Sequence, residues 1–434
     1  MSNPIHSVSA KSVLPILAMR GLATGLCTGC VVGLLRLSHD RTAARVALWL
    51  EDWREAWWTA PLWFGVLVVI AVILRRIVRE EPLISGSGIP QTELALAGCL
   101  SFTWWRVLLA KFLGSWLALF GGLALGREGP SIQMGGAVGA GFHGLWRPSA
   151  PRSFAGSPYV VAGAVAGLAA AFGAPAAGVL FAFEEMKSRR DASLVVAACA
   201  AAVGAHLMIR IVFGMGRILP FAGFEAPPLS SFWIVALEGA VFGVLGVGYN
   251  KTLLWLHDAE ARQALIPDRW RALPPLLLSG CLALFAPLLI GGGESLIIFA
   301  GEHEVALKTL IVLLAFKYLF AQYSTVAAIP GGLLMPILCL GALWGRLWAE
   351  LPVAALAAHG LASGPVQPYV LFGMVSYFAA TVRAPLTGII LVTEMSGTYT
   401  CLPGSLLAGL IACKIANLLH CPPVYDSLKE RIRL

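Results

Sequence analysis

Residues 159–186 read "YVVAGAVAGLAAAFGAPAAGVLFAFEEM", and residues 369–395 read "YVLFGMVSYFAATVRAPLTGIILVTEM". The two stretches carry the same residue at ten positions, all at a constant offset of 210. The shared positions include Tyr159, Gly163, Pro175 and Glu184, which match Tyr369, Gly373, Pro385 and Glu394. Similarity at a fixed offset indicates an internal repeat, so the chain is expected to contain one structural unit twice.

Two shorter pairs upstream support this repeat. "GREGP" (126–130) and "GLLMP" (332–336) share the pattern G-x-x-x-P, and "GSG" (86–88) precedes "GGG" (291–293) by 205 residues. The pairs occur in the same order at nearly one spacing. We therefore predict two repeats, 12–218 and 232–427, joined by the proline-containing and turn-forming linker 219–231.

The composition is that of an integral membrane protein. Of 434 residues, 58% are hydrophobic and only 12% are charged, and the mean hydropathy is +0.80. Roughly ten apolar runs between residues 12 and 420 approach the length needed to span a bilayer. We predict an all-α polytopic membrane protein without a large soluble domain. The net charge of +8 reflects lysine and arginine in loops, so nucleic acid is not an expected partner, whereas membrane lipid is.

The charges that follow the two long repeats differ. The first copy runs into "KSRR" (187–190), whereas the second runs into the uncharged "SGTYTC" (396–401). Cationic loops stay on the cytoplasmic side, so the equivalent ends are expected to face opposite sides of the membrane. This predicts inverted-topology repeats, as in many secondary transporters. The basic C-terminal "LKERIRL" places that end in the cytoplasm, and we expect both termini there, in a multi-pass protein of the cell inner membrane.

Glycine-rich turns interrupt the apolar sequence. They are "SGSGIP" (85–90), "GREGP" (126–130), "GGG" (291–293) and "PGGLLMP" (330–336). Irregular backbone at membrane depth survives only inside protein or beside water. Helix N-termini attract anions, so several converging broken helices would form an anion site. Simple helix capping or close packing of small residues is the alternative, but four related turns in paired positions favour the anion site.

The motifs "GSGIP" and "GREGP", with the second-half G-x-x-x-P, resemble those of the CLC family of chloride channels and chloride/proton exchangers. The resemblance covers roughly residues 12–427. It implies the CLC fold, a homodimer with one complete pore per subunit, and chloride and protons as the transported ions. No cofactor is expected.

The resemblance also implies a set of anion ligands. Ser87 and Tyr425 match the two hydroxyl-bearing residues that coordinate the central anion. Leu333 and Leu334 match the pair whose backbone amides complete this site. Gly86 and Gly88 flank the inner anion position.

Two glutamates match the proton-handling residues of the family. Glu128 matches the gating glutamate, which occupies an anion position when ionised and leaves it when protonated. Physical chemistry agrees, because a carboxylate beside an anion-binding turn is a tethered competitor for the anion. Glu185 matches the inner glutamate that exchanges protons with the cytoplasm.

The neighbours of these glutamates have open roles. Arg127 either adds positive potential at the mouth of the pore or pairs structurally. Glu184 follows the repeat and is expected to have a structural role at a helix end, as Glu394 has. Glu185 has no acidic counterpart, so it is the better candidate for proton transfer. Its alternative role is a carboxylate paired with "KSRR" at the cytoplasmic end.

Other polar residues in apolar sequence are weaker candidates. Lys111, Lys317 and Lys414 are expected to snorkel or pair rather than line a pore. Cys27 and Cys30 form a lone C-x-x-C in an apolar helix, and the histidines lack ligand spacing, so no metal site is expected.

Leu334 stands where the family usually has phenylalanine, and "TVAAIP" (325–330) lacks the Ser-Gly of many members. These departures affect the expected rate and selectivity. Ser87 favours chloride, because nitrate-selective relatives tend to carry proline there.

The sequence therefore predicts a chloride/proton antiporter with a glutamate gate. A passive chloride channel of the same fold is the alternative, but channel members typically lack an acid at the position of Glu185. An enzyme is not expected, because no nucleophile with a base and no metal motif such as His-Glu-x-x-His is present.

Overall fold

The computed structural model describes residues 10–51, 56–146, 153–187, 191–219, 221, 224–262, 267, 270–361, 365 and 367–432. These residues are largely helical and contain no β-strand beyond one isolated bridge. The first half forms α1 (Ala10–Glu51), α2 (Thr59–Glu80), α3 (Ile89–Leu96), α4 (Trp104–Phe120), α5 (Glu128–Trp146), α6 (Pro158–Phe172), α7 (Pro175–Glu184) and α8 (Ala192–Leu207). The second half forms α9 (Phe232–Arg262), α10 (Leu273–Phe285), α11 (Glu294–Glu302), α12 (Leu307–Val326), α13 (Leu334–Trp348), α14 (Ala354–Ala358), α15 (Pro368–Val382), α16 (Pro385–Ser396), α17 (Leu402–Leu418) and α18 (Val424–Lys429).

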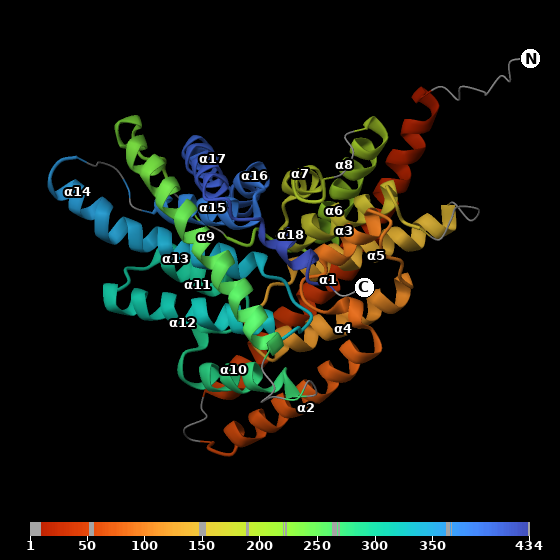
Figure 1. Cartoon of the computed structure of the whole chain (residues 1–434), viewed down its shortest axis with the longest axis horizontal. Helices are drawn as coiled ribbons and strands as arrows, with labels where there is room; N and C mark the ends of the chain where they lie inside the picture. The colour runs from red at the N-terminus through yellow and green to blue at the C-terminus, as the bar shows by residue number, and fades with distance from the viewer. Residues whose placement is uncertain are drawn as a thin grey trace, which may run out of the picture.

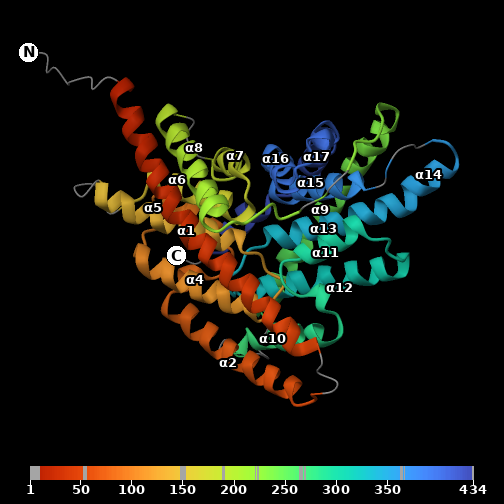
Figure 2. The same ribbon diagram turned by 180° about the vertical axis from the view of Figure 1, so that it is seen from behind.

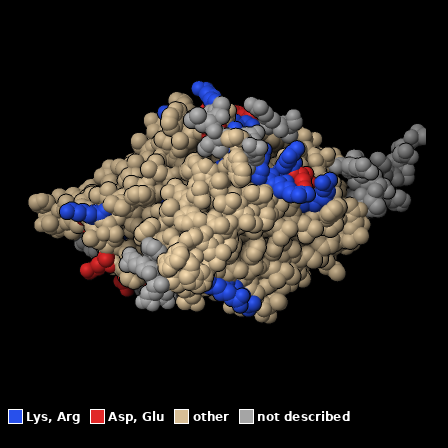
Figure 3. Space-filling view, turned by 90° about the horizontal axis from the view of Figure 1, so that it is seen from below, with Lys and Arg blue, Asp and Glu red and all other residues tan. Residues whose placement is uncertain are grey.

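Seven helical segments in the described residues are long and apolar enough to cross a membrane. Large apolar side chains on their outer surfaces are exposed, for example Val69 on α2, Leu319 on α12 and Leu410 on α17. Figure 3 shows a broad central surface without charge, with lysine and arginine in its upper part, at its lower edge and at its left end. Such a belt is suited to lipid. The chain is a multi-span membrane protein, as its composition predicts.

Several helices are too short to span a bilayer, which needs about 20 residues. They begin at Pro158, Pro175, Pro368 and Pro385, where proline fixes a helical φ and the missing amide costs no hydrogen bond. α6 ends at Gly173, whose φ of +67° stops the helix. The predicted fold of tilted and broken helices is confirmed.

The two halves repeat the same packing. Figures 1 and 2 show the first half on one side of the molecule and most of the second half on the other. In the first half, α5 meets α6 where Gly135 faces Gly163, and in the second half α13 meets α15 where Gly341 faces Gly373. A side chain on any of these glycines would strike the carbonyl of its partner. The close approach explains why glycine recurs at these places.

The two halves meet along one edge of the molecule and near its middle. α7 lies beside α16, and both views place this pair along one edge of the molecule, between α8 and α17. The short C-terminal helix α18 lies near the middle, against α3 and α15. Elements distant in sequence thus converge on one central region.

Candidate functional site

The two pairs of glycine turns have matching backbone geometry. Gly86 and Gly88 precede α3 with φ values of +65° and +87°. Gly291 and Gly293 precede α11 with φ values of +66° and +108°. These left-handed conformations favour glycine, which explains why both halves keep it there. The predicted correspondence of "GSG" with "GGG" is therefore found in the backbone as well.

A backbone bridge joins the N-termini of α5 and α13. The amides and carbonyls of Gly126 and Gly332 exchange two hydrogen bonds of 2.7 Å. Next to this bridge, the Gly331 amide donates to the Gly86 carbonyl at 3.0 Å. The first amides of a helix have no partner within it, so this bridge places two sets of unpaired donors side by side.

Two buried lysines hold the turns. Lys111 Nζ donates to the Ile84 and Gly86 carbonyls at 2.7 Å each, and Lys317 Nζ donates to the Leu289 and Gly291 carbonyls at 2.9 and 2.7 Å. Both lysines are wholly buried, so of the two expected roles, snorkelling and pairing, the structure shows pairing for these two. They pair with carbonyls, which apolar periodicity does not reveal. Lys414 is exposed, consistent with snorkelling.

Ser87 and Tyr425 both lie buried in the central region. Ser87 packs against Gly129 in the first turn of α5, and its Oγ lies 3.3 Å from the Ile89 amide. The Tyr425 side chain is 0% exposed, and its hydroxyl has no hydrogen-bond partner among the described residues. Buried hydroxyl groups normally have a partner, so the Tyr425 hydroxyl is free to bind a ligand or water, as are several other buried hydroxyls, for example that of Tyr249.

The backbone at the start of α13 belongs to the same region. Leu333 immediately precedes the helix and Leu334 is its first residue. Their side chains are 1% and 0% exposed. Because their amides lie at the helix N-terminus, they have no partner within the helix. Leucine, rather than the phenylalanine usual in the family, thus fills the packed space at residue 334.

Glu128 begins α5 at the boundary between this region and a cavity. It is 1% exposed, and neither carboxylate oxygen makes a hydrogen bond of good geometry among the described residues. The carboxylate lies against Gly126, close to Met335. A cavity of about 890 Å³ reaches Glu128 and is also lined by Arg127 and Glu294. The Glu128 carboxylate therefore has the cavity on one side and the buried turns on the other.

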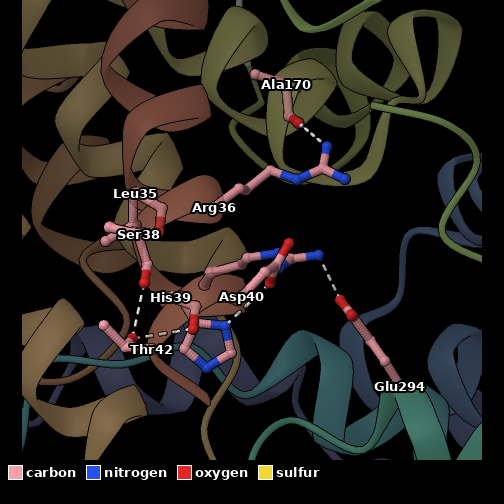
Figure 4. A network of polar contacts seen from close by, with 9 residues as sticks. Leu35, Arg36, Ser38, His39, Asp40, Thr42, Ala170 and Glu294 are labelled. Carbon is pink, nitrogen blue, oxygen red and sulfur yellow. Dashed lines mark hydrogen bonds and ion pairs between the residues drawn. The ribbon is translucent and has the colours of Figure 1, made fainter. Parts of the chain in front are cut away.

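Arg127 pairs with two carboxylates at the wall of this cavity. Its guanidinium lies 3.2 Å from Asp40 Oδ1 and 2.5 Å from Glu294 Oε1. His39 lies 3.2 Å from the same Asp40 oxygen. Figure 4 shows this network, with His39 and Asp40 on α1 and Glu294 on α11. Of the two roles considered for Arg127, the structure shows the pairing.

Glu184 and Glu185, at the end of α7, differ in their hydrogen-bond partners. The Glu184 carboxylate accepts hydrogen bonds from the Thr387 amide and hydroxyl at 2.6 and 2.8 Å, as a structural residue would. Glu185 is 5% exposed and forms no ion pair with Lys187, which lies 2.8 Å from Asp426 instead. Residues 188–190, the rest of "KSRR", lie outside the described residues.

Three charged residues of this region were not predicted. Glu93 on α3, with Asp426 and Lys429 on α18, forms an ionic network near Glu185. Lys429 Nζ lies 2.7 Å from Glu93 Oε2 and 3.1 Å from Asp426 Oδ1. The only available signal was the position of Glu93 within an apolar segment after "GSGIP".

Comparison with known proteins agrees with this geometry. A family model described as "Voltage gated chloride channel" matches residues 65–417. The H(+)/Cl(-) exchange transporter ClcA of Vibrio cholerae is 33% identical over 94% of this chain and 89% of its own length. ClcA of Vibrio campbellii is 34% identical over 97% of this chain and 89% of its own length.

Solved structures show the same fold. A slow cyanobacterial Cl-/H+ antiporter superposes with a TM-score of 0.89 at 28% identity, covering 96% of this chain and 97% of that one. A CLC-type fluoride/proton antiporter superposes with a TM-score of 0.74 at 20% identity, covering 96% and 99%. With the repeats, the glycine turns and the full-length relatives in agreement, the chain belongs to the voltage-gated chloride channel (CLC) family.

Proposed function

We propose that this protein exchanges chloride for protons across a membrane. The observation that carries the proposal is the placement of the buried Glu128 carboxylate at the joined N-termini of α5 and α13, at the wall of a cavity. The exchange activity named for the ClcA relatives, which align along nearly the whole chain, supports it.

The central anion would be held by neutral donors. The proposed ligands are the hydroxyl groups of Ser87 and Tyr425 and the backbone amides of Leu333 and Leu334, with Gly86 and Gly88 flanking the inner position. Neutral hydroxyls and helix N-termini attract chloride without a full positive charge, so the ion is released readily. Lys111 contributes indirectly, because it fixes the carbonyls that precede Ser87.

Glu128 would act as the gate. When ionised, its carboxylate occupies the position that an anion would take at the helix N-termini. When protonated, it loses its charge and its hold on these donors, so it swings toward the cavity and an anion enters. Binding of chloride and binding of a proton are thereby linked through one side chain, without covalent chemistry.

Glu185 would exchange protons with the cytoplasm. It is nearly buried, lies at the end of α7 and is not engaged by Lys187, in contrast to Glu184. A buried carboxylate without a fixed cation changes its protonation more readily than one that caps a helix. The passive channel remains the alternative function, and the presence of Glu185 disfavours it.

The proposal also includes the membrane, the orientation of the termini and the oligomeric state. We place it in the cell inner membrane with both termini in the cytoplasm, as a homodimer of two complete pores in contact with lipid. The exposed apolar residues on α8 and α17 offer a surface that a second copy or lipid would cover, among them Val203, Leu207, Leu406 and Leu410. The proposed repeats remain 12–218 and 232–427, with the linker at 219–231, of which positions 220, 222 and 223 lie outside the described residues.

Current recorded from the purified protein in a planar bilayer tests the exchange. A chloride channel reverses at the chloride equilibrium potential whatever the pH on either side. An exchanger reverses at a potential that also depends on the pH gradient. We expect the reversal potential to shift when only the pH of one chamber is changed. A reversal potential that tracks chloride alone would support the channel.

A further inference from the structure

The helix that carries Tyr425, α18, is too short to be stable without contacts to other elements. α18 has six residues, whereas isolated helices shorter than about 12–15 residues are marginal in water. Tyr425 is nevertheless wholly buried at the centre of the protein. Contacts from other elements must therefore fix α18, and with it the Tyr425 hydroxyl.

Three ion pairs attach this end of the chain to three different elements. Lys429 pairs with Glu93 on α3 at 2.7 Å, Asp426 pairs with Lys187 after α7 at 2.8 Å, and Arg431 pairs with Asp258 on α9 at 3.1 Å. Burial favours the neutral amine of Lys429, but the hydrogen bonds and charges of Glu93 and Asp426 outweigh it and raise the pKa of Lys429 to about 12. The lysine is therefore charged at neutral pH.

The Lys429–Glu93 pair differs from the other two in what it joins. Glu93 lies six residues after Ser87, on the helix that "GSGIP" begins, and its side chain is 6% exposed. Lys429 lies four residues after Tyr425, one turn along α18. The pair thus connects the two elements that present the hydroxyl groups of Ser87 and Tyr425. The Arg431–Asp258 pair holds the same end of the chain but reaches neither Ser87 nor α3, and its side chains are 28% and 45% exposed.

We propose that the Lys429–Glu93 ion pair is a clamp that fixes the spacing between Ser87 and Tyr425, and thereby sets the affinity of the central anion position. This inference rests on the proposed function, because it assigns a role at the same anion site. Lys429 and Glu93 are positioning residues that act through the two hydroxyl-bearing side chains. The pair brings together residues 336 positions apart, one from each half of the chain.

Electrostatics alone offers a different explanation, and a set of variants separates the two. Lys429→Met removes the clamp and leaves the Glu93 charge buried and unpaired, which would repel an anion. The double variant Glu93→Gln/Lys429→Met removes the clamp and the charge together. A clamp predicts weaker chloride binding in both variants. A purely electrostatic role predicts recovery in the double variant.

Isothermal titration of chloride into the purified full-length protein provides the measurement. We expect about tenfold weaker binding in Lys429→Met and in the double variant, the change that about 1.4 kcal/mol of lost positioning produces. Lys429→Arg, which keeps a cation within reach of Glu93, restores most of the affinity. Arg431→Met and Arg76→Met, which remove more exposed ion pairs, change it less than twofold. Thermal unfolding without chloride shows whether each variant is folded.

The outcomes separate the clamp from the proposed function. Three results would each overturn the clamp and leave the proposed function intact, provided that the wild-type protein transports chloride. They are an unchanged chloride affinity in Lys429→Met, recovery of the affinity in the double variant, and an equal loss of affinity in Arg431→Met. A wild-type protein that neither binds nor moves chloride would overturn the clamp together with the proposed function. Weak chloride binding in Lys429→Met and in the double variant, together with a chloride affinity near that of the wild type in Lys429→Arg, supports the clamp.

Discussion

Glu184 caps the helix that carries Glu394, and Glu394 caps the helix that carries Glu184, where the two halves of the chain meet. Glu184, at the end of α7, accepts hydrogen bonds from the amides of Leu386 and Thr387 at the start of α16. Glu394, near the end of α16, accepts from the amides of Ala176 and Ala177 at the start of α7, at 3.2 and 3.0 Å. The repeat thus stabilises the place where the two halves meet.

This reciprocity predicts similar effects of Glu184→Ala and Glu394→Ala. Each substitution leaves two helix N-terminal amides without an acceptor and removes a charge that complements the helix dipole. We expect each to lower stability by about 1–2 kcal/mol, measured as unfolding in detergent. Glu304→Ala, at an exposed carboxylate, serves as the control. Loss of proton transport in Glu184→Ala at unchanged stability would instead make Glu184 a proton-transfer residue.

Lys111→Met and Lys317→Met form a matched pair at equivalent places. Each substitution removes the donor to two backbone carbonyls, one of them in a buried hydrogen bond, so each is expected to lower stability by about 1–3 kcal/mol. Only Lys111 holds the turn that carries Ser87, so only Lys111→Met should also weaken chloride binding. Equal chloride affinities in the two variants, measured by titration, would contradict the proposed position of the anion.

Glu128→Gln mimics the protonated gate. The amide has nearly the shape of the carboxylic acid but cannot release a proton, so chloride would pass while proton transport stops. We expect chloride efflux from liposomes to become independent of pH in this variant. Proton transport that persists in Glu128→Gln would exclude Glu128 from the proton path.

The carboxylates around Arg127 predict an effect that depends on salt. Arg127→Met leaves Asp40 and Glu294 uncompensated at the cavity wall, and their negative charge should slow chloride access from that side. Salt screens such charges, so the loss in chloride flux should be larger at low than at high ionic strength. The double variant Arg127→Met/Glu294→Gln should recover part of the flux. A loss that is equal at all salt concentrations would indicate a packing role for Arg127.

The sequence predicted the features that lie within short motifs or in the repeat. The broken helices, the paired glycine turns and the structural role of Glu184 could all be read from local sequence and the offset of 210. Contacts between distant segments could not. For Lys111 in its apolar run, snorkelling and pairing both stayed open, because periodicity does not show which carbonyls face the side chain. Glu93 and Lys429 are 336 residues apart, and neither belongs to a repeated pair.

The most direct test of the account is proton movement in liposomes that contain the purified protein and a chloride gradient, with no pH gradient imposed. We predict that chloride flux drives protons uphill, and that Glu185→Gln abolishes the proton movement while chloride flux persists. Chloride flux without proton movement in the wild-type protein would contradict the exchange mechanism. Glu185 would then be only a carboxylate at the end of α7, and the protein would be a channel.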